Sequence, residues 1–298
     1  MYKCILWGMG QEFHKCINGI KYQELSNDIM VVGVTSDNTK FKEYFGYKYV
    51  CKENLHTIDY DIVIVMGERK TYFDVVKEAI ELGISEEKII PYRILAKPGV
   101  SLEKYMNLKK NPPTIFANNC WGGITYYYLF LEFCSPLVNM FQSDNDYIKF
   151  LLRPQHYMEQ PLYLKEYRYG VVLDRDYPVC SCDDINLYFN HYESFEDAVS
   201  CWERRKKRIN WDNLFVMMYT EDEEIARVFS ELPYKKKICF VPFESNGDGI
   251  CSLSFRNRSE WKDIPFWEIV NSMANEKLLY YDAVELIHDG KIKKLCEI

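Results

Sequence analysis

The chain has 298 residues, of which 48% are hydrophobic, so it is long enough for two domains with separate cores. Its net charge of -7 argues against a nucleic-acid partner, because non-specific binding to a phosphate backbone depends on an excess of Lys and Arg. Aromatic residues make up 16% of the chain, an excess that suits carbohydrate surfaces and equally the packing of a core or of a homo-oligomer interface.

The start of the chain and its cysteines indicate a compartment. Met1 is followed at once by a strand-like segment, without a leader sequence, and no apolar run reaches the length of a membrane span. The eleven Cys residues include no C-x-x-C pair of the kind that binds zinc, and in a reducing compartment most should be buried thiols. Cys180 and Cys182 would share one face of a strand and stay unpaired. We therefore expect a cytoplasmic protein without a membrane span or a metal site.

The first part of the chain alternates between apolar strands and amphipathic helices. The predicted strands are residues 3–8, 30–37, 60–66 and 88–91, and the predicted helices are residues 11–25 and 71–82. Continuous apolar runs of this kind are typical of parallel strands covered by helices on both faces. The sequence therefore predicts an α/β fold with a parallel sheet.

A domain boundary is predicted where Pro98, Gly99 and the Asn-Pro-Pro break at residues 111–113 interrupt the pattern. We expect a linker over residues 95–113, with one domain over residues 1–110 and a larger α/β domain over residues 111–298.

The first domain has features of a dinucleotide fold. Gly8 and Gly10 end the first strand with a tight turn, and Asp37 follows the second strand where an acid holds a ribose or simply forms a turn. Phe13 occupies the place of the third fingerprint glycine and is too bulky for close helix–sheet packing, which argues against NAD, and the sequence specifies no cofactor. The domain resembles the small N-terminal Rossmann-like unit of bacterial sugar O-acyltransferases and related glycan-processing proteins, which implies at most binding of a nucleotide sugar or substrate.

The sequence Asn-Asn-Cys-Trp-Gly-Gly at residues 118–123 separates a short strand at Thr114 from an aromatic, helix-length segment. Its Asn pair tolerates left-handed backbone, and its Gly pair lets the backbone lie close to a bound molecule. A helix starting near Gly123 would direct free N–H groups toward the Cys and Trp, where an anion or a developing negative charge is stabilised. A structural strand-to-helix turn explains the same pattern, and the sequence alone leaves both interpretations open.

The rest of the chain again mixes strands and helices. The predicted strands are residues 162–168, 170–174, 184–189, 214–219, 237–242 and 249–254, and the predicted helices are residues 147–152, 221–232, 265–273 and 281–288. The clearest helix starts after the N-cap Ser194, and Trp202 belongs to its apolar stripe.

One flank of the helix that follows Ser194 carries three guanidinium groups, those of Arg204, Arg205 and Arg208. Together they are suited to hold a phosphate or a carboxylate. For Arg204 alone a solvated helix face is the simpler interpretation, whereas Arg205 lies close enough to the apolar stripe to need a buried partner or a ligand.

A series of motifs containing rare residues runs through most of residues 114–220. The motifs are Asn118-Asn119-Cys120-Trp121-Gly122-Gly123, Ser135-Pro136, Glu159-Gln160-Pro161, Tyr177-Pro178, Asp183-Asp184-Ile185, Phe189-Asn190-His191-Tyr192 and the stretch from Trp202 to Phe215. With them the second domain resembles the bacterial family known as domain of unknown function 1919, whose members are generally described as exopolysaccharide-biosynthesis proteins. The resemblance implies a pathway and no particular reaction. Cys180-Ser181-Cys182 stands where we expect a Gly-containing step between two of these motifs.

The candidate site joins these motifs in one pocket. The candidate catalytic residues are Cys120, Asp183, Asp184 and His191, and the candidate substrate-binding residues are Asn118, Asn119, Trp121, Gly122, Gly123, Trp202, Arg204, Arg205 and Arg208. His191 oriented by a carboxylate would act as a general base on a sugar hydroxyl, or it is a hydrogen-bonded structural His. Cys120 is either a nucleophile at a helix N-terminus or an inert buried thiol. Adjacent Asp side chains on a strand point opposite ways, so one Asp as orienter or base is preferred to a metal pair.

Two functions follow from this pattern. The first is a transferase of exopolysaccharide or capsule biosynthesis that moves a glycosyl or acyl group and acts on a nucleotide-activated or lipid-linked sugar precursor. The second is a non-catalytic nucleotide-sugar-binding or scaffold protein of the same pathway. The expected partner in both is a sugar nucleotide or a glycan precursor.

Overall fold

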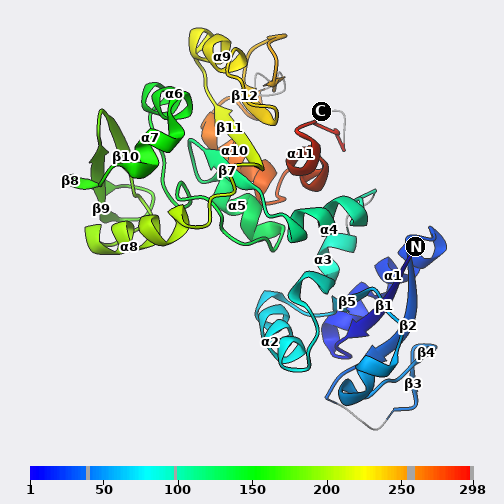
Figure 1. The fold of residues 1–298 in the computed structure, drawn as a ribbon. Helices are drawn as coiled ribbons and strands as arrows, with labels where there is room; N and C mark the ends of the chain where they lie inside the picture. The colour runs from blue at the N-terminus through cyan, green and yellow to red at the C-terminus, as the bar shows by residue number, and fades with distance from the viewer. Residues whose placement is uncertain (38–40, 97–98, 254–258, 296–298) are drawn as a thin grey trace. The chain divides into compact units, whose positions relative to one another are not determined.

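The computed structural model describes residues 1–37, 41–96, 99–253 and 259–295. The chain forms two compact units, Met1–Lys110 and Asn111–Ile298 (Figure 1). Both units combine parallel sheets with helices, and the α/β class predicted from the sequence is therefore confirmed.

The N-terminal unit is built on a parallel sheet with the strand order β2-β1-β5-β6. Its strands are β1 (Tyr2–Trp7), β2 (Ile29–Thr35), β5 (Ile62–Val65) and β6 (Ile89–Pro91), and a two-stranded hairpin is formed by β3 (Glu43–Tyr44) and β4 (Tyr47–Lys48). Its α-helices are α1 (Gln11–Leu25), α2 (Arg69–Glu81), α3 (Tyr92–Leu95) and α4 (Leu102–Lys110), with 3-10 turns at Lys52–Thr57 and Glu86–Lys88. The apolar strands β1 and β5 are almost wholly buried, as expected for strands that helices cover.

The predicted linker over residues 95–113 is corrected by helix α4. Leu102, Tyr105, Met106 and Leu108 form its buried face, so that the segment packs as an amphipathic helix. Pro98 lies outside the described residues. The turn signals at residues 111–113 do mark the end of the unit, because α4 stops at Lys110.

The C-terminal unit has a parallel sheet with the order β13-β12-β11-β7 and an antiparallel sheet with the order β10-β9-β8. The parallel strands are β7 (Thr114–Ala117), β11 (Leu214–Tyr219), β12 (Lys237–Val241) and β13 (Ile250–Ser252), and the antiparallel strands are β8 (Tyr163–Gly170), β9 (Arg175–Cys182) and β10 (Ile185–Tyr188). The helices are α5 (Trp121–Tyr128), α6 (Asp144–Leu152), α7 (Pro154–Glu159), α8 (Phe195–Lys206), α9 (Glu223–Ser230), α10 (Phe266–Ala274) and α11 (Ala283–Asp289). Of the predicted strand 249–254, Ser254 lies outside the described residues.

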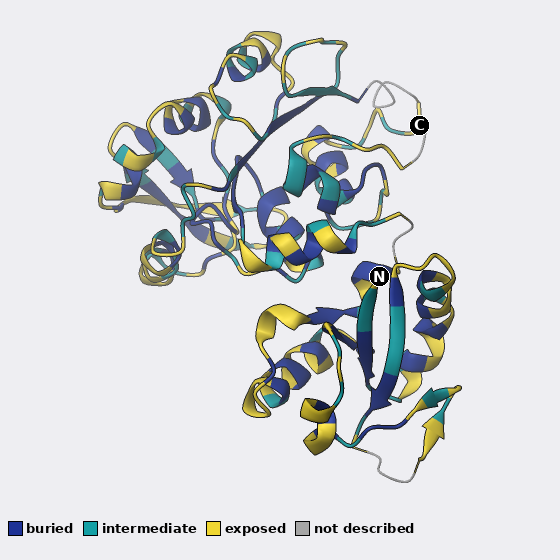
Figure 2. Cartoon of the chain, turned by 45° about the vertical axis from the view of Figure 1, so that its right-hand side comes forward, coloured by how far each residue is buried: buried dark blue, intermediate teal, exposed yellow. Residues whose placement is uncertain are grey.

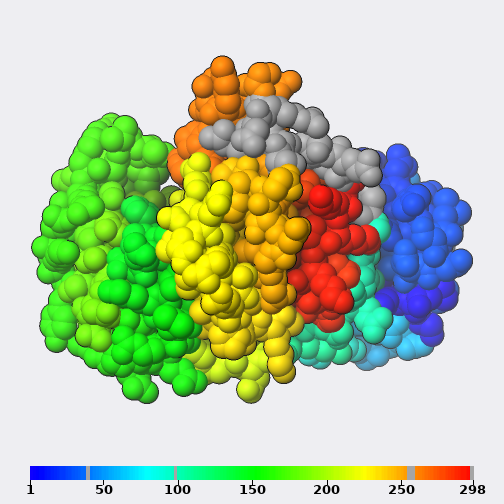
Figure 3. Space-filling view, turned by 90° about the horizontal axis from the view of Figure 1, so that it is seen from above, coloured from blue at the N-terminus to red at the C-terminus, as the bar shows by residue number. Residues whose placement is uncertain are grey.

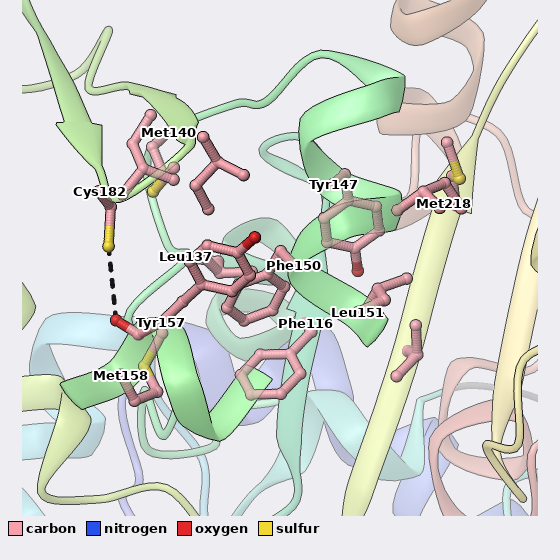
Figure 4. Close-up of a cluster of buried hydrophobic side chains, with 14 of the residues drawn as sticks. Phe116, Leu137, Met140, Tyr147, Phe150, Leu151, Tyr157, Met158, Cys182 and Met218 are labelled. Atoms are coloured by element: carbon pink, nitrogen blue, oxygen red, sulfur yellow. Dashed lines mark hydrogen bonds between the residues drawn. The ribbon is translucent and has the colours of Figure 1, made fainter. Parts of the chain in front are cut away.

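The parallel sheet of the C-terminal unit has a hydrophobic core on each face, because alternate side chains of a strand point to opposite sides. Figure 2 shows its strands mostly in the dark blue of buried residues. On one face, Phe116 and Met218 join the side chains of α6, α7 and the antiparallel sheet (Figure 4). On the other face, Phe215 and Phe240 lie against Trp121. Figure 3 shows the yellow residues of α9 beside the green residues of α6, and these two helices are in contact.

One predicted strand of this unit is wrong, and one helix is shorter than the aromatic segment that contains it. Of the predicted strand 170–174, Gly170 is the last residue of β8 and residues 171–174 form the turn to β9. Val171 and Val172 are 82% and 80% exposed in this turn, and the next strand begins only at Arg175. The helix in the aromatic segment stops at Tyr128, because Phe130 takes a left-handed conformation with φ 53°. The Leu131 N–H then donates to the carbonyl of Tyr126, which closes the helix end in the manner of a Schellman motif.

Candidate functional site

A thiol and an imidazole meet beside the carboxyl ends of two strands. Cys120 follows β7 and stands at the N-cap position of α5, and His191 follows β10. The Sγ of Cys120 lies 3.2 Å from Nε2 of His191, within hydrogen-bonding distance for a sulfur. Cys120 is half-buried and His191 is exposed, so the pair is accessible from solvent. The sequence placed these two residues together as candidates, and the structure brings them into contact.

The segment at Phe141 and Gln142 holds the two strand ends together. Phe141 and Tyr188 exchange backbone hydrogen bonds of 3.0 Å, and their rings are stacked with centroids 4.7 Å apart. The next N–H, that of Gln142, donates to the carbonyl of Asn118 at 3.0 Å. The end of β10 is therefore tied to the end of β7 through two residues, and the turns that carry His191 and Cys120 must lie next to each other.

The surroundings of the pair shift both pKa values in the direction that favours the neutral form of each group. Burial raises the pKa of the Cys120 thiol to about 11, against the opposing effect of a hydrogen bond from Asn190. Although His191 as a residue is exposed, partial desolvation of its ring lowers its pKa, and the positive charge of Arg175 lowers it further. A thiol with a raised pKa beside an imidazole with a lowered pKa gives an S–H donor and a neutral acceptor nitrogen. The arrangement corresponds to a base-assisted nucleophile, in which the proton leaves the sulfur as the new bond forms.

The Asn pair beside Cys120 supports the backbone. Asn118 extends the contact between β7 and β11, since its Nδ2 donates to the Tyr219 carbonyl at 3.0 Å and its Oδ1 accepts from the Tyr219 N–H at 3.2 Å. Asn119 accepts from the Trp121 N–H at 3.0 Å and donates to Asn271 at 3.2 Å. One of the free N–H groups at the start of α5 is thereby used by the protein itself. Both Asn side chains are buried, and their hydrogen bonds fix the backbone that precedes Cys120.

The Gly pair allows close packing of protein against protein. A Cβ on Gly122 would lie 3.2 Å from Cβ of Ala117, and a Cβ on Gly123 would lie 3.0 Å from Cγ1 of Val138. The predicted close approach to a bound molecule is therefore corrected: the nearest neighbours of the two glycines are the buried side chains of Ala117 and Val138, and Gly122 lets α5 lie directly on β7.

The two tryptophans do not share a pocket. Trp121 is 0% exposed and stacks on Phe215 with centroids 6.0 Å apart. Trp202 is 1% exposed and belongs to the cluster that contains Phe116, with its ring 6.2 Å from that of Phe189. They therefore occupy the cores on opposite faces of the parallel sheet, and the prediction that they form walls of one substrate pocket is wrong.

The predicted guanidinium flank is also wrong. Arg205 is 7% exposed, and its Nη1 donates to the Val138 carbonyl at 3.2 Å and to the hydroxyl of Tyr192. Arg208 pairs with Glu132 at 3.2 Å, and Arg204 contacts the sulfur of Cys201. Each of the three side chains has a different partner within the protein, so the three do not form one anion-binding surface. By binding Tyr192, Arg205 holds the turn that carries His191.

Asp183 and Asp184 lie in the turn before β10, at the opposite end of that strand from His191. Asp183 pairs with His156 at 2.7 Å. Asp184 accepts from the Tyr157 hydroxyl at 2.6 Å and pairs with Lys149 at 3.1 Å, and these two hydrogen bonds lower its pKa. The strand between them separates Asp184 from His191 by roughly 10 Å or more, at about 3.3 Å per residue. The prediction that one Asp orients His191 is therefore wrong.

Comparisons with known proteins place the chain in a family. The family model described as Domain of unknown function (DUF1919) matches residues 92–288, which is more than half of the chain. The chain belongs to the DUF1919 family. A second model, described as C2185-like, N-terminal, matches residues 1–90. A protein of Haemophilus influenzae named "Uncharacterized protein" is similar to this chain, with 34% identity over 156 residues that cover 51% of the chain and 73% of that protein.

The candidate cofactor residues of this DUF1919 chain lie in the N-terminal unit and are described by themselves. Gly8 has φ +116°, and a Cβ there would lie 3.1 Å from the Met66 carbonyl oxygen, whereas Gly10 is the uncapped N-cap residue of α1. Asp37 is exposed and forms an ion pair with the buried Lys52. The carboxylate expected near a ribose is thus already paired with a cation of the protein.

Neither a metal-binding cluster nor a membrane-spanning helix occurs among the described residues of the DUF1919 chain. No three His, Cys, Asp or Glu side chains gather in a way that could hold a metal within residues 1–37, 41–96, 99–253 and 259–295. Over the same residues, no helix has the length and the apolar character that a membrane crossing needs.

Two residues of the site that were not among the predicted site residues are Asn190 and Arg175. Asn190 precedes His191 in a motif already noted, whereas Arg175 follows a segment mistaken for a strand.

We expect the thiol of Cys120 to react slowly with iodoacetamide at neutral pH. Because only the thiolate is alkylated and the pKa is about 11, the rate should rise about tenfold per pH unit up to about pH 10. The measurement is peptide mass spectrometry of the labelled protein at several pH values, with glutathione as the reference thiol and Cys120→Ala to identify the peptide. A rate that levels off near pH 8.5 in the native protein contradicts the buried, protonated thiol.

Proposed function

We propose that this DUF1919 chain transfers an acyl group to a hydroxyl of a sugar precursor, with Cys120 as nucleophile and His191 as general acid and base. The observation that supports the proposal is the 3.2 Å contact between Sγ and Nε2 at the end of β7, where α5 begins. Nucleophile and base within hydrogen-bond reach are the signature of covalent group transfer. Of the two group transfers expected from the sequence, a thiol as nucleophile favours the acyl group.

The reaction proceeds in two half-reactions, each of which transfers one proton through His191. In the first, Sγ attacks the carbonyl carbon of the acyl donor, His191 takes the thiol proton, and the leaving group departs with that proton. A thioester on Cys120 remains. In the second, a sugar hydroxyl attacks the thioester, His191 takes the hydroxyl proton and delivers it to Sγ as the ester product leaves. Base assistance is essential here, because the thiol with its pKa of about 11 is not ionised beforehand.

The proposed pathway is exopolysaccharide or capsule biosynthesis, with a nucleotide-activated or lipid-linked sugar as the acceptor. The resemblance of the motifs in residues 114–220 supports this pathway. The same proposal takes the N-terminal unit as a Rossmann-like module that binds the sugar nucleotide. Its parallel strand order β2-β1-β5-β6 and the tight turn after β1 support this role.

A cytoplasmic location is supported by the ten described cysteines, all of which are free.

The test is to trap the thioester. The protein is incubated with a panel of acyl-coenzyme A donors, and its intact mass is measured before and after addition of sugar nucleotides. We expect one acyl group on Cys120, lost when the correct acceptor is added, and no acylation of Cys120→Ala. Asp184→Asn is the matched control, because Asp184 lies at the far end of β10, and it should acylate like the wild type. Binding of a sugar nucleotide without acylation by any donor would favour the non-catalytic alternative.

A further inference from the structure

Two residues beside the Cys120–His191 pair have buried polar atoms without partners: Arg175 acts electrostatically on His191, and Asn190 hydrogen-bonds to Cys120. Within the part of the chain that the structure describes, Nε of Arg175 and Oδ1 of Asn190 are buried and make no hydrogen bond. A buried polar atom without a partner is unfavourable, and more so when the group is charged. A bound molecule that reaches both residues would supply the missing partners.

Arg175 lies beside the turn that carries His191. Strands β9 and β10 are antiparallel up to the pair Val179 and Tyr188, and the Phe189 N–H continues the ladder to the Pro178 carbonyl at 3.0 Å. Continuing this register brings the residues after Phe189 to the first residues of β9. The contact is direct at Glu193, whose Oε1 accepts from Nη1 of Arg175 at 2.9 Å.

The ion pair with Glu193 leaves Arg175 available to a ligand. The Glu193 side chain is 84% exposed, so this is a surface pair of small strength, and it uses only one nitrogen of the guanidinium group. The remaining buried Nε–H points to a second acceptor that the described residues do not provide. Two nitrogens of one guanidinium plane are suited to the two oxygens of a carboxylate or a phosphate.

We propose that Arg175 binds an anionic group of the substrate next to His191, and that Asn190 accepts a hydrogen bond from a hydroxyl of the same molecule. The substrate class is a hydroxylated anion, such as a sugar phosphate or a sugar carboxylate. This inference rests on the proposed function for the identity of the reacting hydroxyl, but the anion site itself does not depend on catalysis.

The groups around His191 give the site a measurable signature. Arg175 of β9 acts on His191 electrostatically, and Glu193 lies two residues after His191 in the same turn. Cys120 contacts the His191 ring, and Asn190 hydrogen-bonds to Cys120. The positive charge of Arg175 disfavours protonation of His191, so an anion bound to Arg175 cancels part of that charge. Anion binding should therefore raise the pKa of His191.

The experiment follows His191 by NMR in protein labelled at its histidines, with the resonance assigned by His191→Gln. The probes are glucose 1-phosphate, glucuronate and, as a neutral comparison, glucose, at one ionic strength in chloride. We expect one or both anions to shift the His191 signals in a saturable way and to raise its pKa, whereas glucose leaves them unchanged. A response to only one anion distinguishes phosphate from carboxylate.

Variants at Arg175 complete the test. Arg175→Gln should raise the pKa of His191 in the free protein and weaken binding of the anion by about tenfold or more, because a charge-assisted pair is lost. Arg175→Lys keeps the positive charge but lacks the planar guanidinium group with its two parallel donors. The pKa of His191 should therefore stay low while binding of the anion weakens. Arg168→Gln, in the neighbouring strand β8, is the matched control and should bind like the wild type.

The outcomes separate this inference from the proposed function. A His191 signal indifferent to both anions, or an equal response in Arg175→Gln, overturns the anion site. Anion binding with no thioester on Cys120 leaves the site standing and removes acyl transfer. A thioester that forms while Arg175→Gln leaves the KM of every anionic acceptor unchanged removes the anion site alone.

Discussion

Replacing Trp121 by Ala should lower the free energy of unfolding of the C-terminal unit by about 3–5 kcal/mol. The side chain is fully buried between α5 and the parallel sheet, where it stacks on Phe215 and lies 6.4 Å from the ring of Phe240. Its Nε1 also donates to the hydroxyl of Tyr281 at 2.9 Å. The substitution therefore leaves a cavity and, in addition, a buried hydroxyl without its partner.

Trp202 provides the matched comparison for this prediction. It is equally buried, but its Nε1 makes no hydrogen bond within the described residues. Trp121→Phe should thus cost more than Trp202→Phe, because only the former removes a hydrogen bond. Urea denaturation followed by circular dichroism measures both changes. A loss below about 1 kcal/mol for Trp121→Ala would contradict the buried role and restore Trp121 as a wall of a ligand pocket.

His191→Gln should reduce the rate of acylation of Cys120 by about 100-fold to 10,000-fold, because the thiol then has no base to take its proton. The imidazole is exposed at the surface, so the stability of the protein should change little. The measurement is single-turnover acylation with the donor that the mass-spectrometric screen selects, together with thermal unfolding of the variant.

The pH dependence of the same rate gives the sign of the His191 shift. The neutral imidazole is the active form, and its pKa lies below the ordinary value of 6.5 because of burial and of Arg175. The rate should therefore stay high as the pH falls to 6.5 and decline only below it. Asp184→Asn serves again as the control, with an unchanged profile. Wild-type rates in His191→Gln, or an equal loss in Asp184→Asn, would remove His191 from the mechanism.

Elements whose signals are local could be predicted from the sequence closely. Strand β11 was predicted over residues 214–219 and is observed over Leu214–Tyr219, because a continuous apolar run belongs to a strand buried on both faces. Ser194 was predicted as the N-cap of α8, and its side chain does accept from the Asp197 N–H at 3.1 Å. Such signals lie within a few residues of the structure that they determine.

The predictions that failed concern residues whose surroundings are set by distant parts of the chain. Val171 and Val172 look like strand residues but lie in an exposed turn, since the register of β8 with β9 decides where the hairpin turns. Arg205 looks available to a ligand on a helical wheel, yet its acceptor at Val138 lies 67 positions away in the chain. A pattern within one element cannot reveal a partner that another element supplies.

The amino-acid sequence by itself determined the α/β class, most of the strands and helices, and the residue types that can perform nucleophilic and base chemistry. Only the tertiary structure decided which of them meet. Cys120 and His191, separated by 71 positions, come together through Phe141 and Gln142, whereas Asp184 is much nearer to His191 in the chain but is held apart by a rigid strand. The reason is that periodicity and capping act over a few residues, while a site is assembled by hydrogen bonds and packing between distant segments.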